Sequence, residues 1–253
     1  MDFKIEGGQT STGETNFGIV KEEVATAQKD VYCIYGRKGV GKTTLAMSFE
    51  GRKDVLSFDR KSLRVKTGMY LDKEEIHVYD AIKYLEPGEN TYTSTSNKTF
   101  DYAIHILEQI PETDWIIIDG LEILTKICEM RMRYKENLGP FKNFSNFSLW
   151  KLRRLYIRQL HELAISKARK GIIYTTYITK DEVIEEGKTI TKADIPNWID
   201  IVMEETDVVI KVYPEKQKDK TIKHMAFIES SKLTTLKTGD IQDVTDGRLT
   251  YLQ

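Results

Sequence analysis

A glycine-rich segment has the residue types and the spacing needed to hold phosphate groups. It reads Gly36-Arg37-Lys38-Gly39-Val40-Gly41-Lys42-Thr43 and matches G-x-x-x-x-G-K-[ST] at every fixed position. The glycines allow successive backbone N–H groups to converge on one anion, and a helix that begins at Lys42 adds the positive end of its dipole. Lys42 supplies a mobile positive charge for the β- and γ-phosphates, and the hydroxyl of Thr43 can ligate Mg²⁺.

A chance glycine-rich turn before a helix is the alternative interpretation of this segment. The apolar run before it and the helical pattern after it argue against chance. The sequence therefore predicts a site for Mg²⁺ and a nucleoside triphosphate, whose binding residues are Gly36, Arg37, Lys38, Gly39, Val40, Gly41, Lys42, Thr43 and Thr44.

An acidic residue at the end of an apolar run supplies the second half of this site. The run Trp115 to Ile118 is apolar on both faces, as a central parallel strand requires, and it ends at Asp119. A carboxylate at that point can hold Mg²⁺ through its water shell. Aspartate also ends ordinary strands because turns favour it. Together with the phosphate-binding loop, the pattern predicts Thr43 and Asp119 as the metal-binding pair.

Hydrolysis also needs a carboxylate that orients and deprotonates water beside the γ-phosphate. Asp59 ends a second apolar run and is our preferred candidate, with an ordinary strand-ending role as an equal alternative. The remaining candidates for this base are Glu74, Glu75 and Glu122.

Alternating strands and helices are needed to bring these residues together. Short apolar runs predict strands at 31–35, 54–58, 76–79, 115–118 and 172–178. Helical spacing predicts helices at 42–50, 81–86, 100–110 and 149–169. The Ser/Thr-rich residues 91–99 are expected to form a surface loop.

Two late runs, 208–213 and 224–229, predict an antiparallel hairpin across a lysine-rich turn. The order of elements predicts an α/β fold with a mostly parallel central sheet, helices on both faces and this hairpin near the C-terminus. Residues 1–28 read as an N-terminal arm or edge segment, and residues 29–253 as one ATPase core.

Composition excludes several classes of protein. Hydrophobic residues make up 40% of the 253 residues, which excludes a disordered or collagen-like chain. Lys and Arg total 38 against 39 Asp and Glu, so any basic surface must be local. Two cysteines, Cys33 and Cys128, give no disulfide framework and favour a reducing compartment. We expect a cytoplasmic protein with no membrane partner, because no long apolar run or signal pattern is present.

Residues 130–158 combine positive charge with aromatic side chains. The cations in this range are Arg131, Arg133, Lys135, Lys142, Lys151, Arg153, Arg154 and Arg158, against the single acid Glu136. The aromatic residues are Tyr134, Phe141, Phe144, Phe147, Trp150 and Tyr156. Cations neutralise phosphates and aromatic rings stack on unpaired bases, so this stretch is a candidate DNA-binding surface. Packing against a neighbouring subunit and a plain charged helix face are the alternatives.

With these residues placed, the chain resembles the RecA-type recombinase ATPases of the P-loop NTPases, and within them the compact single-domain members of phages and archaeal viruses. The resemblance spans roughly residues 28 to 250 and depends on motif spacing, strand order and the late hairpin. It implies a RecA-like fold and Mg²⁺-dependent ATP hydrolysis coupled to DNA, preferably single-stranded, in recombination, repair or replication. It also implies a homo-oligomer with ATP at the subunit interfaces.

Further site residues follow from the resemblance alone. It implies that Thr176 senses the γ-phosphate and that Lys232 reaches the ATP of a neighbouring subunit. It places a first DNA loop at 135–148 and a second at 179–200, although the acids of the second weaken that assignment. The chain departs from the family at Lys61, where a Glu is usual, so either Asp59 is the base or hydrolysis is slow.

Other functions remain open at this point. A DNA packaging or translocation ATPase would use the same phosphate-binding loop. A nucleotide or small-molecule kinase would need a lid with clustered arginines, for which the candidates are Arg131, Arg133, Arg153 and Arg154. A non-catalytic nucleotide-binding assembly protein would fit the missing Glu.

Overall fold

The computed structural model describes residues 29–68, 74–143, 146–185 and 188–249, with backbone alone for 181–185 and 188–192. The predicted arm at residues 1–28 lies outside the described residues. The strands are β1 (Asp30–Gly36), β2 (Lys53–Ser57), β3 (Ile76–Asp80), β4 (Thr113–Asp119), β5 (Ala168–Glu185), β6 (Lys188–Pro196), β7 (Val208–Lys216), β8 (Ile222–Ser231) and β9 (Ile241–Asp243). The helices are α1 (Lys42–Met47), α2 (Ser62–Gly68), α3 (Tyr92–Gln109), α4 (Leu121–Lys135), α5 (Leu149–Lys167) and α6 (Asp200–Glu205).

One sheet of nine strands organises the described residues, in the order β3-β2-β4-β5-β1-β7-β8-β9, with β6 paired to β5. The pairs from β3 to β7 are parallel, whereas β7–β8 and β8–β9 are antiparallel. This arrangement confirms the predicted mostly parallel sheet and its late hairpin. Because parallel strands end at one edge, the residues that follow β1, β2, β4 and β5 meet there.

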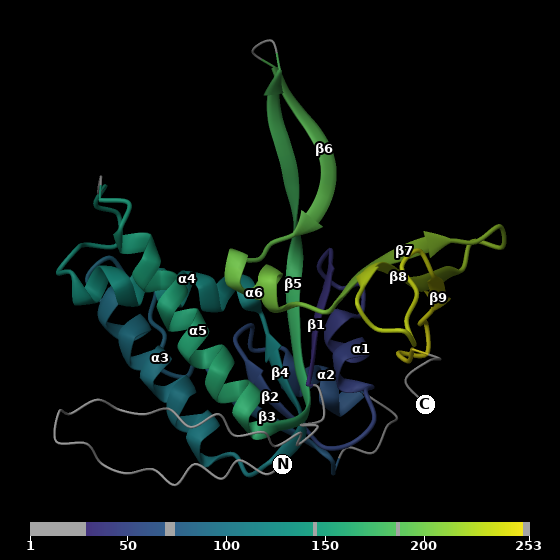
Figure 1. Ribbon diagram of the computed structural model, residues 1–253, viewed down its shortest axis with the longest axis horizontal. Coiled ribbons are helices and arrows are strands. Elements are labelled where there is room, and N and C mark those ends of the chain that lie inside the picture. Colours follow the sequence, from purple (N-terminus) through teal and green to yellow (C-terminus); the bar gives the residue numbers. More distant parts are fainter. Residues whose placement is uncertain (1–28, 69–73, 144–145, 186–187, 250–253) are drawn as a thin grey trace, which may run out of the picture.

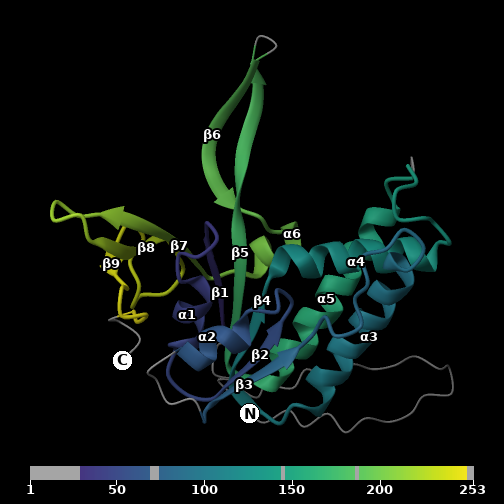
Figure 2. The ribbon, with the colours of Figure 1, turned by 180° about the vertical axis from the view of Figure 1, so that it is seen from behind.

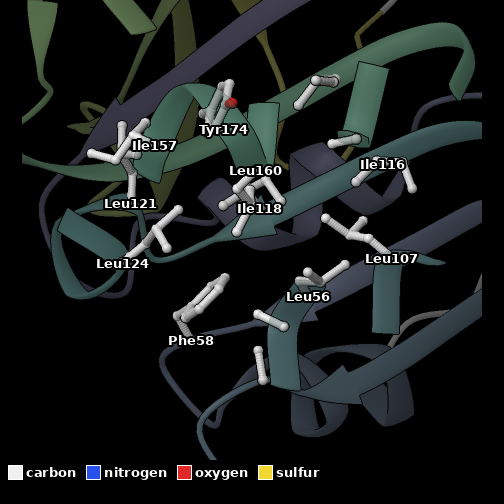
Figure 3. Close-up of a cluster of buried hydrophobic side chains, with 14 of the residues drawn as sticks. Leu56, Phe58, Leu107, Ile116, Ile118, Leu121, Leu124, Ile157, Leu160 and Tyr174 are labelled. Atoms are coloured by element: carbon white, nitrogen blue, oxygen red, sulfur yellow. The ribbon is translucent and has the colours of Figure 1, made fainter. Parts of the chain in front are cut away.

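Helices cover both faces of the sheet, as predicted (Figures 1 and 2). Helices α3, α4 and α5 pack on one face, where alternate strand residues such as Leu56, Ile118 and Tyr174 are fully buried. Figure 3 shows these side chains interleaved with Leu124 and Leu160 of the helices. Helices α1 and α2 lie on the other face, over the intervening strand residues. The period of two in each strand thus assigns successive apolar residues to opposite cores.

Two of the expected elements are wrong. The predicted surface loop at 91–99 is the start of α3, because Ser96 and Thr99 are completely buried and packing outweighs their weak helix propensity. The predicted short helix at 81–86 is a turn in which the amide of Leu85 donates to the carbonyl of Ile82. Burial of Ala81 and Ile82 against the core holds this turn in place.

The strand after α5 also differs from expectation. It begins at Ala168, inside the range predicted as helix, because Ala168 pairs with Thr113 of β4. It continues past 178 to Glu185, where the predicted loop at 179–200 is a β-hairpin formed by β5 and β6 and followed by α6. We call the paired residues 178–185 and 188–196 the arm. The arm projects beyond the rest of the sheet (Figure 1).

Candidate nucleotide-binding site

The loop between β1 and α1 has the backbone conformation that its glycines predict. Gly39 and Gly41 have φ angles of 82° and 96°, in the left-handed region that favours glycine. A Cβ on Gly36 would lie 2.3 Å from the carbonyl oxygen of Val212 in β7. The first glycine of the motif is therefore required by the close approach of the neighbouring strand.

Lys42 is held inside this loop by its own backbone. The side chain is 9% exposed, and Nζ donates hydrogen bonds of 3.1 Å to the carbonyl of Gly36 and 2.9 Å to that of Arg37. The ammonium also lies 4.3 Å from the centroid of the Tyr177 ring. Burial lowers the pKa of Lys42 to about 8, although three nearby carboxylates oppose this shift. The site therefore contains a partly desolvated cation facing the loop.

Three strands place polar residues side by side at the edge of the sheet. Ser57 of β2, Asp119 of β4 and Thr175 of β5 are neighbours in the register. The Asp119 side chain is 2% exposed. Its Oδ1 accepts hydrogen bonds from Thr43 Oγ1 at 2.9 Å and Thr175 Oγ1 at 2.5 Å, and its Oδ2 from Ser62 Oγ at 2.5 Å. Hydroxyl donors thus compensate for the burial of this carboxylate.

These contacts order the hydroxyl protons. Ser62 Oγ lies 2.6 Å from Ser57 Oγ as well as against Asp119, and a hydroxyl has one proton. Ser57 must then donate to Ser62, and Ser62 to Asp119. In the same way Thr175 donates to Asp119 and accepts the amide proton of Gly120 at 3.2 Å.

A cavity of about 300 Å³ lies between the phosphate-binding loop and Asp119. Its walls include Lys42, Thr43 and Asp119, so the structure brings residues of the predicted phosphate-binding loop together with the predicted metal ligand Asp119. The base candidates Asp59 and Glu122 also line it, and so do Thr176 and Lys61. Lys38 lines it as well, so the cavity combines three lysines, three carboxylates and backbone donors.

The two base candidates differ in their surroundings. The amide of Lys61 donates a 2.9 Å hydrogen bond to Asp59 Oδ1, while burial and the nearby Asp119 raise the pKa of Asp59. Burial likewise raises the pKa of Glu122, whose Oε2 lies 3.3 Å from Thr176 Oγ1. The pKa values of both carboxyl groups therefore lie closer to neutral pH than those of exposed carboxylates, which suits a general base.

The oxygen donors at the cavity wall fit Mg²⁺. The described residues contain no group of three or more His, Cys, Asp or Glu side chains that could hold a metal without other ligands. Mg²⁺ is commonly held by one or two carboxylates together with the phosphates of a substrate. Thr43 gives its proton to Asp119, which leaves the lone pairs of its oxygen for the metal. Asp119 and Thr43 would accordingly hold Mg²⁺ jointly with a nucleotide.

Other predicted residues lie away from this cavity. Glu74 and Glu75 precede β3 at the opposite edge of the sheet and are exposed, so the structure excludes them as bases. Lys232 follows β8 near the beginning of β7, also at that edge, and its Nζ lies 3.2 Å from Asp207 Oδ1. The structure therefore does not bring Lys232 to the phosphate-binding loop of its own chain.

Sequence reasoning missed the hydroxyls of Ser57, Ser62 and Thr175, and the ring of Tyr177. A signal for Ser57 and Thr175 was present, since each is a polar residue that follows an apolar run in a parallel strand. Finding Ser62 and Tyr177 required the register and the course of the chain after each strand.

Most arginines of residues 130–158 have partners within the chain. The Arg131 side chain is 12% exposed, pairs with Asp101 at 2.6 Å and stacks on the rings of Phe100 and Tyr156. Arg133 pairs with Glu129 at 3.0 Å. Arg153 lies over the Trp150 ring, and Arg154 pairs with Asp200 and Glu204.

The exposed part of this range is narrower than the sequence implied. Phe141 and Phe147 are 76% and 82% exposed, and Tyr134 is 43% exposed. Lys135 and Lys142 are exposed beside them, in the segment that ends α4 and leads to α5. We call these five residues the α4–α5 loop surface.

Among the described residues, no helix is both long and apolar enough to cross a bilayer.

The protein-family profile AAA_24, described as an AAA domain, matches residues 28–238. No curated protein matches the chain. Among solved structures, the chain is similar to an uncharacterized protein from Pyrococcus horikoshii, crystallised in complex with an unknown peptide. That structure is 10% identical, with a TM-score of 0.36, and the match covers 80% of this chain and 84% of that one.

Proposed function

Because the chain belongs to the AAA domain family, we propose that it binds Mg²⁺·ATP and hydrolyses it in a RecA-like core that acts on DNA. One observation carries the proposal. Lys42, Thr43 and Asp119, which are far apart in the sequence, line one cavity beside left-handed glycines. A bound Mg²⁺·ATP supplies the reactive γ-phosphate and the charge of the metal.

The residues of this chain would then have separate tasks. The loop amides of Gly39 and Gly41 hold phosphate oxygens, and the ammonium of Lys42 leaves the carbonyls of Gly36 and Arg37 for the phosphates. Binding of a polyanion favours the charged form of Lys42, whose pKa burial has lowered. Positive charge is thereby concentrated where negative charge develops during phosphoryl transfer.

Asp59 is the proposed base and Glu122 the alternative, and two isosteric variants separate them. Asp59→Asn and Glu122→Gln each remove one carboxylate from the cavity. The variant of the true base should lose roughly a hundredfold or more in turnover, with little change in Mg²⁺·ATP affinity. If both variants lost only a small and equal part of their turnover, neither residue would be the base.

Binding itself is tested by calorimetry with Mg²⁺·ATP, and turnover by phosphate release. Lys42→Ala and Asp119→Asn should abolish or strongly weaken both, whereas Lys218→Ala, at an exposed turn far from the cavity, should have no effect. Failure of the wild-type chain to bind Mg²⁺·ATP would refute the proposal. Tight binding without phosphate release would instead indicate a nucleotide-dependent assembly protein.

For DNA, the α4–α5 loop surface supports the proposal. Its aromatic side chains are exposed and would stack on unpaired bases, and its exposed lysines would neutralise phosphates. Single-stranded DNA should raise the rate of ATP turnover. Stimulation by double-stranded DNA alone would favour a packaging or translocation ATPase.

A kinase is the less favoured alternative. No arginine lines the cavity among the described residues, and the four arginines considered for a lid contact the chain itself. Phosphoryl transfer to a nucleoside monophosphate, measured in the same assay, would reverse this preference.

We also propose a homo-oligomer with ATP between subunits, in which Lys232 would have to leave Asp207 to reach a neighbour.

A further inference from the structure

Ser62 is the first residue of α2, and its side chain is fully buried. Its Oγ lies 2.5 Å from Oδ2 of Asp119 and 2.6 Å from Oγ of Ser57. Because Ser57 donates to Ser62, the single hydroxyl proton of Ser62 is committed to the carboxylate of Asp119. Ser62 is not part of the cavity wall, so any effect that it has on a ligand must pass through its neighbours.

The hydrogen bonds of Asp119 leave one position on its carboxylate for a cation. An ionised carboxylate has about four lone-pair positions over its two oxygens. Thr43 and Thr175 both donate to Oδ1, whereas Oδ2 accepts a hydrogen bond from Ser62 alone among the described residues. The remaining position is therefore on Oδ2 of a residue that lines the cavity. The bond from Ser62 fixes the rotation of the carboxylate, and so the direction of this position.

The same hydroxyl fastens the turn between β2 and α2, which carries the proposed base Asp59. Arg60 in this turn has a φ of 62°, in the left-handed region, which costs free energy for a residue other than glycine. Before the turn, the amide of Phe58 donates a 2.8 Å hydrogen bond to the carbonyl of Asp119. After the turn, Ser62 donates to the Asp119 carboxylate. The turn is thus tied to Asp119 at both ends.

We propose that Ser62 is a positioning residue for ATP hydrolysis, which holds the carboxylates of Asp119 and Asp59 in a fixed relation. Without its hydroxyl, the carboxylate of Asp119 is free to rotate and one end of the turn is released. The first change weakens the hold on Mg²⁺, and the second displaces the base. This inference rests on the proposed function, because Ser62 has this task only when Mg²⁺·ATP occupies the cavity.

Ser62→Ala tests the role through metal binding as well as through turnover. Calorimetry with ATP in Mg²⁺ and with ATP in EDTA gives the factor by which the metal strengthens ATP binding. This factor should fall about tenfold in Ser62→Ala, because Asp119 loses a hydrogen bond to a charged group. ATP affinity in EDTA should stay nearly unchanged, since Lys42 and the phosphate-binding loop are intact. In an Asp119→Asn background, Ser62→Ala should lower the factor no further, because both substitutions act on one carboxylate.

Turnover provides the second measurement. The kcat of Ser62→Ala should fall about tenfold, with a smaller change in KM, and Ser62→Thr, which retains the hydroxyl, should recover most of the loss. Ser57→Ala keeps the bond from Ser62 to Asp119 and should have a smaller effect than Ser62→Ala. The matched control is Ser96→Ala, which removes a fully buried hydroxyl in α3, outside the cavity wall, and should leave the metal factor and kcat unchanged.

Urea unfolding shows whether each variant is folded. If Ser62→Ala does not fold, Ser62→Cys replaces it, because a thiol is a weaker donor of similar shape and should lower the metal factor by a smaller amount.

The outcomes separate this inference from the proposed function. A wild-type chain that does not bind Mg²⁺·ATP refutes the proposed function, and the inference with it. A wild-type chain that binds and hydrolyses ATP, beside a Ser62→Ala variant that matches Ser96→Ala in metal factor and kcat, overturns the inference alone. Lower stability of Ser62→Ala with an unchanged metal factor also overturns it, because the hydroxyl would then only stabilise the fold.

Discussion

Lys42→Met should stabilise the nucleotide-free protein, although it destroys the site. Methionine retains most of the apolar stem of the lysine and removes a desolvated charge. The fall of the Lys42 pKa from 10.5 to about 8 corresponds to a folding penalty of about 3 kcal/mol for the charged form. We therefore expect the free energy of unfolding at pH 7 to be higher in the variant than in the wild-type chain, by up to about 3 kcal/mol.

The stability difference between Lys42→Met and the wild-type chain should depend on pH. Below the folded-state value of about 8, Lys42 is protonated in both states and the full penalty is present. Between that value and 10.5 the unfolded chain binds more protons than the folded one, so wild-type stability rises with pH. The advantage of Lys42→Met should accordingly shrink across this window.

Urea unfolding of both proteins at pH 7 and at about pH 9.5 measures the difference in free energy, with Lys218→Met as the control for an exposed lysine. Because other titrating groups are shared, they cancel in the comparison. Equal or lower stability of Lys42→Met at pH 7, or a difference that does not change with pH, would refute the reasoning. The same experiment with Mg²⁺·ATP present should reverse the order, since only the wild-type chain is stabilised by the ligand.

Three further predictions follow from the site and its surroundings. Gly36→Ala should lower the free energy of unfolding by about 2 kcal/mol or more in urea, because its Cβ would meet Val212. Gly139→Ala should leave the free energy of unfolding nearly unchanged, because nothing lies within 4 Å of a Cβ there. Equal effects of the two substitutions would contradict the argument. Thr175→Val should cost about 2 kcal/mol, because Asp119 loses a donor and the Gly120 amide its acceptor; an unchanged midpoint would show that neither bond matters. Lys135→Gln with Lys142→Gln should reduce the salt slope of single-stranded DNA binding by about 1.4, and a slope equal to that of a Lys218→Gln, Lys220→Gln control would exclude this surface.

The residues of the phosphate-binding loop could be predicted because their signal is local. The glycines, Lys42 and Thr43 are adjacent in the chain, and the conformation they need depends on their own backbone. Asp119 was predictable for a similar reason, since an apolar strand and the acid that ends it are contiguous. The proposed base could not be chosen in the same way, because Asp59 and Glu122 line the same cavity and both carry a carboxylate there.

Features that depend on packing could not be predicted. The cations Arg131 and Arg133 suggested a nucleic-acid surface, but their partners come from α3 and from elsewhere in α4. The residue type of Ser96 indicates a loop, whereas in the structure Ser96 is buried in α3, which packs against α4 and α5. The β5–β6 hairpin was not predicted because the resemblance to the recombinases placed a DNA loop at 179–200, and the pairing of its two strands is visible only in the structure.

The continuity of β5 has a mechanical consequence. The strand carries Thr175, which donates a hydrogen bond to Asp119, and Tyr177, whose ring lies against Lys42, and it then continues through a register shift between Asp181 and Glu182 to Glu185 at the arm. At about 3.3 Å per residue, the stretch beyond Tyr177 is a lever roughly 26 Å long. A tilt of about 10° at its base would move the far end by about 5 Å, so a small adjustment beside the cavity would become a displacement as large as the spacing between two strands.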